Sequence, residues 1–199
     1  MLFYPQEKRP PEALNNPEFI LRPLRVEHVD LDYAAVMEDP AYLRSWGQGS
    51  WPADNFTLEE NLLDLERHQR EHSEMTAFTF TVLSPAEDTC FGCVYITPIG
   101  MRIPASQIPP GYQAEPRQHV GDVCFWVRPS LQAHELDLHV LSALLGWLRS
   151  DWHFDRILFH TSGEDVHQQR LFERCGLDPI ARFNAVEPRP GEWILYHAY

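Results

Sequence analysis

The sequence is poor in glycine, cysteine and basic residues. Of its 199 residues, 10 are glycine and 4 are cysteine. Four cysteines do not make a disulfide scaffold at this length, so we expect free thiols and a cytoplasmic location. The sequence contains 16 Lys and Arg residues and 29 Asp and Glu residues, which gives a formal net charge of −13. This excess of acids argues against nucleic acid and anionic membranes as partners and favours cationic small molecules or basic partners.

Long apolar runs and several familiar motifs are also missing. The sequence has no run of about 18 apolar residues, so we expect no transmembrane helix. Its first residues lack the charged-then-apolar layout of a signal peptide. It contains no Gly-x-Ser-x-Gly and no P-loop pattern, so neither type of site is expected.

The residues that are present suffice for one large hydrophobic core. Apolar residues make up 44% of the chain and aromatic residues 12%, and a chain of this length corresponds to about one domain. Many of the 17 prolines cluster in two segments. We expect residues 1–17 as an extended arm and residues 98–118 as an irregular excursion, and we predict one domain over residues 18–199.

Hydrophobic periodicity predicts alternating strands and helices. Strands are expected over residues 19–24, 77–83, 90–97, 122–127, 156–160, 180–183 and 193–197, and helices over residues 26–37, 57–72, 136–148 and 165–174. The strand–helix–strand–helix run near 122–175 implies parallel pairing through right-handed crossovers. The remaining strands are expected to be antiparallel. The predicted fold class is therefore α/β, with a central mixed β-sheet and helices on both faces.

Three segments together resemble a known family. They read FILRPLRVEHV at 19–29, FWVRP at 125–129 before a buried helix, and LFERCGL at 171–177 at the end of a late helix. Their order and spacing resemble the GNAT superfamily of acyl-coenzyme A-dependent acyltransferases. The resemblance implies a GNAT-like fold and transfer of an acetyl or acyl group from acetyl-CoA to an amine.

The resemblance also implies a site for the pyrophosphate of coenzyme A. In the family, backbone amides of a Gln/Arg-x-x-Gly-x-Gly/Ala loop hold it at a helix N-terminus. The matching residues here are Gln132, Ala133, His134, Glu135, Leu136 and Asp137. Both glycine positions carry acids, Glu135 and Asp137, whose charge and Cβ atoms oppose a close pyrophosphate. Acids also suit the first turn of an ordinary helix, so loss of coenzyme binding stays an open alternative.

Other family positions surround the thioester. The resemblance implies that the backbone of Trp126 and Val127 binds the pantetheine arm. Asp165 and Phe172 stand where the family usually has a cofactor-binding Asn and a Tyr that protonates the leaving thiolate. Phe172 has no proton to give, which is a second departure from the family pattern.

The amine must lose a proton, and two residues are candidates to accept it. Asp122 starts the predicted central strand and His160 ends the next one, so parallel pairing would place both at one cleft. His119 and Glu115 are weaker candidates in or beside the excursion. For Asp122 and His160 the structural alternatives are a solvated strand end and a half-buried polar side chain.

Two patterns suggest metal binding without establishing it. Residues 68–72 read HQREH, which matches a zinc-peptidase pattern, but the helix around them is polar and we interpret it as a solvated face. Cys90 and Cys93 form a CxxC pair in a strand. We interpret them as buried thiols, with zinc binding together with Cys124 as the alternative. No metal site is assigned.

The segment Gly47-Gln48-Gly49 lies between two indoles, Trp46 and Trp51. It is interpreted either as part of an acceptor pocket or as a packing element, and not as a dinucleotide-binding loop.

The sequence therefore predicts an acetyl-CoA-dependent N-acetyltransferase that acts on a small or cationic amine or a basic peptide. The alternative is a non-catalytic GNAT-like binding protein, favoured by Glu135, Asp137 and Phe172. A transferase whose donor lacks a pyrophosphate is a third interpretation. Because the arm and the terminal strands could exchange between chains, a homodimer also stays open.

Overall fold

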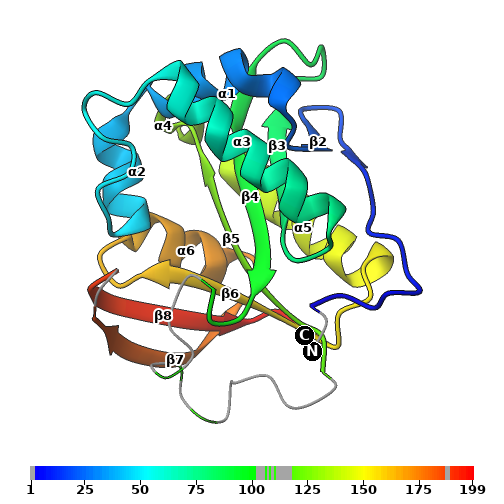
Figure 1. Ribbon diagram of the computed structural model, residues 1–199. Helices are drawn as coiled ribbons and strands as arrows, with labels where there is room; N and C mark the ends of the chain where they lie inside the picture. The colour runs from blue at the N-terminus through cyan, green and yellow to red at the C-terminus, as the bar shows by residue number, and fades with distance from the viewer. Residues whose placement is uncertain (1–2, 102–105, 107, 109, 111–117, 187–188) are drawn as a thin grey trace.

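The chain folds around one mixed sheet of eight strands, shown in Figure 1 as a computed structural model. The strand order is β1-β2-β3-β4-β5-β6-β8-β7, and β5 and β6 form the parallel pair within it. The structure describes residues 3–101, 106, 108, 110, 118–186 and 189–199. The strands are β1 (Leu14–Asn15), β2 (Ile20–Pro23), β3 (Phe78–Leu83), β4 (Cys90–Pro98), β5 (Val120–Val127), β6 (Arg156–Ser162), β7 (Asp178–Ala185) and β8 (Gly191–His197).

Helices cover both faces of the sheet (Figure 1). They are η1 (Val26–His28), α1 (Val29–Val36), α2 (Pro40–Gly47), α3 (Leu58–Ser73), α4 (Pro129–Gln132), α5 (Leu136–Asp151) and α6 (Val166–Arg174). On one face, α5 and α6 pack into the main core with residues such as Leu141 and Leu171. On the other face, α1 and α2 pack over Cys124 and Trp126 of β5, and α3 lies beside α1. None of the helices in the described ranges combines the length and apolar character of a membrane span.

Local sequence signals set several helix ends. Thr57 and Glu60 form the capping box that the sequence predicts for α3, because each side chain accepts a hydrogen bond from the other's backbone N–H. The Asp165 carboxylate caps α6 by accepting from the backbone N–H of Gln168. After α6, Gly176 adopts a φ of 75°, which a glycine tolerates best. These ends fix where α6 begins and stops against the sheet.

The parallel strands β5 and β6 separate before they end. Their last paired residues are Val123 and Phe159. β5 continues to Val127 and β6 to Ser162, while the other edge of β6 pairs with β8 from Leu158 to Ser162. The opening between residues 124–127 of β5 and 160–162 of β6 is called the splay below. Its apex lies at the last pair.

The predicted mixed sheet is confirmed, and three short elements are missed. Composition assigns residues 46–52 to a loop, yet α2 extends to Gly47. This helix begins after Asp39, whose carboxylate accepts from the backbone N–H of Tyr42, and with Pro40 at its first position. β1 and α4 are also missed, because two and four residues are too few for a periodic pattern. Most of the predicted excursion over 98–118 lies outside the described residues.

The predicted arm is anchored in the main core. Tyr4 is 1% exposed, and its ring packs edge-on against Phe78, Trp152 and Phe154 at centroid distances of 5.4, 5.6 and 5.2 Å. Farther along the arm, β1 pairs with β2 at the edge of the sheet. The arm therefore contributes both a strand and a core side chain to the domain.

We predict that the substitution Tyr4→Ala lowers the free energy of unfolding by about 3 kcal/mol, because it leaves a cavity among aromatic rings. Urea unfolding at constant pH measures this change. Lys8→Ala, at an exposed position of the same arm, is the matched control and is expected to change stability little. Equal effects of the two substitutions would show that the arm is not anchored by Tyr4.

Candidate active site

A buried acid–histidine pair lies at the apex of the splay. Asp122 is on β5 just before the last pair, and His160 follows that pair directly on β6. The His160 Nδ1 atom lies 2.7 Å from the Asp122 Oδ1 atom, and each residue is 3% exposed. The sequence predicts these two residues as separate candidates for one cleft. The structure brings them into direct contact.

The environment of His160 favours its protonated form. Burial alone lowers the pKa of the imidazole, but the negative charge of Asp122 and the neighbouring Cys124 raise that pKa to about 9. The raised pKa favours the imidazolium form near neutral pH, which would give the ring a proton to donate. The sequence analysis assigned the pair to proton acceptance, whereas this arrangement makes donation the first available step.

Two glutamines bind backbone carbonyl oxygens that β5 turns toward the splay. The Gln168 side-chain amide donates to the oxygen of Phe125 at 2.8 Å, and that of Gln132 donates to the oxygen of Val127 at 2.9 Å. The oxygen of Trp126 points the other way, so that a Cβ atom on Gly92 of β4 would lie 2.0 Å from it. Successive residues of a strand turn their backbone groups to opposite neighbours.

This alternation determines which backbone groups of β5 face the splay. The backbone of Trp126 pairs with β4 and does not face the splay, whereas that of Val127 does. Phe125 takes the place that the sequence analysis gave to Trp126. The two positions differ by one residue. Because successive residues of a strand turn to opposite sides, this difference reverses the side that the backbone groups face.

The turn before α5 offers fewer free amides than the sequence predicts. Within it, the amides of Ala133, His134 and Glu135 already donate to the carbonyl oxygens of residues 131, 131 and 132. The structure gives no hydrogen-bond partner, among the residues it describes, to the amides of Leu136 and Asp137. These two amides, at the N-terminus of a 16-residue helix, suit one phosphate oxygen each.

The two acids at the glycine positions behave differently. Glu135 has a φ of 57°, the left-handed region that favours glycine, and its exposed carboxylate pairs with Arg174 at 2.7 Å. The Asp137 carboxylate is buried and accepts from the backbone N–H of Leu138 at 2.9 Å and contacts His167 Nε2 at 2.5 Å. The backbone at Glu135 therefore adopts a conformation that favours glycine, while the Asp137 carboxylate lies beside the helix N-terminus in contact with His167.

The α6 positions predicted to touch the cofactor are occupied by structural contacts. Asp165 caps the helix, and burial raises the pKa of its carboxyl group. Phe172 is fully buried, and its ring packs against Phe125, Phe159 and Tyr196. Phe172 is therefore a core residue in this structure, and its contact with a cofactor stays a prediction.

A cavity of about 500 Å³ opens on the α2–α3 side of the sheet. Three aromatic side chains line it, those of Trp46, Trp51 and Tyr95. Trp46 also borders the recess in front of His160, as does Arg189, which donates to the carbonyl oxygen of Gly47 at 3.1 Å. The cavity and the apex of the splay thus share one wall, which fits the interpretation of Trp46 and Trp51 as parts of an acceptor pocket.

Three of the charged groups in this cavity, Asp64, Arg67 and Glu71, come from one side of α3, and Arg189 is a further one from outside it. Arg67 pairs with Asp64 at 2.8 Å and with Glu71 at 3.3 Å. His68 contacts the Thr79 hydroxyl at 2.9 Å, and burial lowers the pKa of its imidazole. His72 instead packs edge-on against Phe78 and Phe80. The HQREH pattern is therefore a packed helix face among the described residues, with no metal cluster on it.

Sequence reasoning missed two polar residues that shape the splay. Gln168 is 5% exposed and its side-chain oxygen has no hydrogen-bond partner in the described part of the chain. Tyr42 of the missed helix α2 accepts from Gln132 at 2.9 Å, and its burial, followed by the charge of Asp165, raises the pKa of its hydroxyl. The sequence does contain a signal for Gln168, because it follows the helix-cap residue Asp165 by three positions. Tyr42 could not be identified without predicting α2, the helix that carries it.

The Asp122–His160 contact predicts a pH dependence of stability. Because the pKa of His160 rises from 6.5 in the unfolded chain to about 9 in the folded one, the folded state binds the extra proton between these values. The free energy of unfolding should therefore be highest below pH 6.5 and fall by about 3 kcal/mol as pH rises through 9. Urea unfolding over this range measures it.

The change in the free energy of unfolding with pH, and not its absolute value, identifies His160 as the titrating group. The variant His160→Asn is expected to lose most of the fall, and the matched variant His197→Asn, at an exposed position of β8, is expected to keep it. The same slope in wild type and His160→Asn would contradict a protonated buried pair.

Comparisons with known proteins agree with this architecture. The chain is similar to ribosomal-protein-S5-alanine acetyltransferase from Vibrio fischeri, with a TM-score of 0.73 and 14% identity over 93% of this chain and 94% of that one. It is similar to the RimL ribosomal L7/L12 alpha-N-protein acetyltransferase in complex with coenzyme A, with a TM-score of 0.71 and 14% identity over 94% and 97%. It is also similar to the microcin C7 self-immunity acetyltransferase MccE in complex with acetyl-CoA and AMP, with a TM-score of 0.74 and 11% identity over 94% and 96%.

At these identities the solved structures establish the fold alone. Among curated proteins no relative matches. A family model, that of the GNAT acetyltransferase domain, matches residues 18–178, which is well over half of the chain. The chain therefore belongs to the GNAT acetyltransferase family.

Proposed function

We propose that this protein transfers an acetyl group from acetyl-CoA to a primary amine. The observation that carries the proposal is the Asp122–His160 pair, which lies at the apex of the splay and beside the aromatic cavity. A donor entering along β5 and an amine entering through the cavity would meet at this pair. The protonated imidazole is then within the reacting region and outside bulk water.

The donor is proposed to bind along β5 and at the start of α5. The carbonyl oxygens of Phe125 and Val127 face the splay, and the amides of Leu136 and Asp137 face outward from the helix N-terminus. Gln168 and Gln132 would move aside or bind the donor's own polar groups. RimL and MccE, two similar structures, contain coenzyme A and acetyl-CoA respectively, which supports this choice of donor.

The acceptor is proposed to be a cationic amine, either a small molecule or the end of a peptide. The cavity offers aromatic walls, which attract ammonium groups, and the carboxylates of Asp64 and Glu71, both of which are paired with Arg67. The overall charge of −13 would steer such acceptors toward the protein. Two similar proteins are named as acetyltransferases of ribosomal proteins, which supports a peptide acceptor as one form of this class.

Proton transfer through His160 completes the proposed reaction. The acceptor would react as the free amine, its ammonium proton having passed to solvent. Bound acetyl-CoA would supply a thioester whose carbonyl carbon forms the new bond to this nitrogen while its bond to sulfur breaks. The ring nitrogen of His160 that does not contact Asp122 donates a proton to the departing sulfur. His160 then regains a proton from the amine nitrogen, so that the pair returns to its starting state. Asp122 acts by keeping the imidazole oriented and charged.

A second candidate function is supported by the turn before α5. The Asp137 carboxylate already accepts from the Leu138 amide, so the chain's own anion lies where a pyrophosphate oxygen would bind. This observation favours a GNAT-fold protein that binds a ligand in the aromatic cavity and performs no transfer.

Steady-state kinetics test the proposed transfer. With acetyl-CoA and a panel of primary amines and short basic peptides, release of free coenzyme A thiol measures turnover. We expect His160→Gln to lower kcat by about 10²- to 10⁴-fold while the acceptor KM changes little, because general acid catalysis has this magnitude. We also expect wild-type kcat to fall as pH rises through about 9, where His160 loses its proton.

The matched control is His197→Gln, which removes an exposed imidazole from β8 that does not line the described cavity, and should leave kcat unchanged. Loss of activity only through a raised KM would show that His160 positions substrate instead of moving a proton. Absence of turnover with every amine, combined with tight ligand binding in the cavity, would favour the non-catalytic function.

A further inference from the structure

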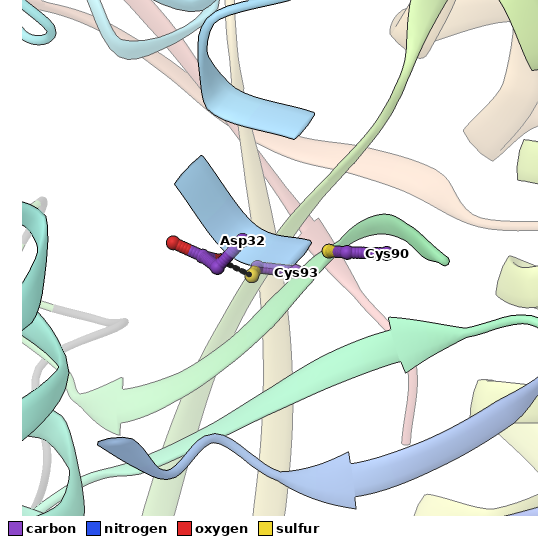
Figure 2. Close-up of side chains that lie close together, drawn as sticks. All are labelled: Asp32, Cys90 and Cys93. Carbon is purple, nitrogen blue, oxygen red and sulfur yellow. Dashed lines mark hydrogen bonds between the residues drawn. The ribbon is translucent and has the colours of Figure 1, made fainter. Parts of the chain in front are cut away.

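A group of three metal-ligating side chains lies under α1, away from the splay. Asp32 of α1 meets Cys90 and Cys93 of β4, and one ligand atom from each lies within 4.8 Å of the others (Figure 2). The Cys93 sulfur is 3.3 Å from the Asp32 Oδ1 atom, and the three residues are between 1% and 4% exposed. All three are buried, and the two cysteines belong to the apolar cluster that α1 and α2 form with Cys124 and Trp126.

The two thiols share one face because the strand is irregular. In a regular strand, residues at i and i+3 point to opposite faces of the sheet. Here Val82 pairs with Gly92 while Leu83 pairs with Cys90, so that Phe91 is an extra residue in β4. Such a bulge re-aims side chains, and it turns both sulfurs toward α1. Bulges of this kind are preserved features of folds and not packing accidents.

A carboxylate is unexpected at this position of α1. The other buried residues of the helix, Ala35 and Val36, are apolar, and an acid in an apolar core costs stability unless it is bound. Asn61 of α3 donates to the Asp32 Oδ2 atom at 3.0 Å and thereby orients the carboxylate toward the sulfurs. Asn61 is itself 1% exposed, and its side-chain oxygen has no hydrogen-bond partner among the described residues. The cluster thus includes an oriented acid and an unsatisfied buried oxygen.

We propose that Asp32, Cys90 and Cys93 bind a zinc ion. Thiolates spaced as C-x₂-C together with a carboxylate are common zinc ligands. Tetrahedral zinc, with Zn–S near 2.3 Å and Zn–O near 2.0 Å, separates a sulfur and an oxygen ligand by about 3.5 Å. The observed 3.3 Å between Cys93 and Asp32 is close to this separation. Binding releases the two thiol protons to solvent, which leaves two thiolates and one carboxylate around the dication.

The Thr81 hydroxyl group lies beside the proposed site. It is 3.4 Å from the Cys90 sulfur, is fully buried, comes from the neighbouring strand β3 and can hydrogen-bond to the Cys90 thiolate. The three protein ligands would come from α1 and β4, with a water molecule in the fourth position of the ion. Zinc binding by the CxxC pair together with Cys124 is the alternative that the sequence leaves open, but Cys124 lies opposite Tyr95 in the β4–β5 ladder and borders the recess near His160.

The consequence of such a site is a clamp between α1 and β4. Tyr95 follows Cys93 by two residues on the same face and lines the aromatic cavity. An ion under α1 would therefore fix the floor of that cavity. This inference is independent of acetyl transfer, because the ion would not touch the splay.

Metal titration of the full chain tests the proposal. The protein is stripped with a chelator under a non-thiol reductant, and zinc uptake is measured by competition with a chromophoric chelator and by elemental analysis. One zinc per chain is expected, together with a rise in the unfolding temperature. Cobalt substitution should give the intense visible bands of a tetrahedral site and the sulfur-to-cobalt charge-transfer absorption of thiolate ligands.

Variants assign the ion to this cluster. Cys93→Ser and Asp32→Asn should lose stoichiometric binding, and Asn61→Ala should weaken it about 10- to 100-fold, as loss of a ligand-orienting contact does. The matched control Cys175→Ser removes a thiol outside the cluster and should bind normally. Wild-type protein that takes up no zinc, or that binds cobalt without the thiolate absorption, would overturn the proposal even if a variant fails to fold. Equal loss in Cys175→Ser and Cys93→Ser would overturn it as well.

Discussion

The early separation of β5 and β6 is the constraint on which the candidate active site depends. Pairing stops at Val123 and Phe159, so the backbone of β5 beyond this point faces an opening instead of a neighbouring strand. The same separation leaves His160 next to an unpaired stretch and near Asp122, in contact at 2.7 Å. A continuous sheet would bury this backbone in a ladder and leave no room for a ligand between the strands.

Side chains in this opening form hydrogen bonds with its backbone groups, so that these groups have partners without a ligand. Buried carbonyl groups need hydrogen-bond donors, and Gln168 and Gln132 supply them to Phe125 and Val127. At the start of α5, Asp137 plays the corresponding part by accepting from a backbone amide. A ligand entering the splay has to replace these contacts with its own. The affinity for acetyl-CoA is therefore a difference between two sets of hydrogen bonds and not the sum of one.

Much of the fold follows from the sequence, and the site follows in part. Long periodic elements such as α5 and the capping box at Thr57 are local signals, and they are found where expected. The sequence predicts that Asp122 and His160 lie close together, because parallel pairing of their two strands places both residues at one cleft. Their direct contact and the protonation that it favours depend on burial, which the sequence does not specify.

The differences between expectation and structure have physical causes of three kinds. Trp126 was expected to face the splay but differs by one residue from the position that does, in a structure with a period of two, and Phe172 was expected at the cofactor from its family position, although its ring lies in the core. The α2 helix, with Tyr42, was lost because glycine and proline composition outweighed its cap at Asp39. Contacts between elements distant in sequence, such as Asp32 with Cys93, have no local signal at all.

Calorimetric titration of acetyl-CoA into the protein, near neutral pH and at modest salt, tests the central claim most directly. The account predicts one site per chain with micromolar affinity, formed by the β5 backbone and the α5 amides. S-acetylpantetheine, which lacks the pyrophosphate, serves as the matched ligand and should bind much more weakly. Equal affinity for the two ligands would show that the α5 amides are not used. Absence of acetyl-CoA binding up to millimolar concentration would contradict the account and identify the protein as a GNAT-fold member without this donor.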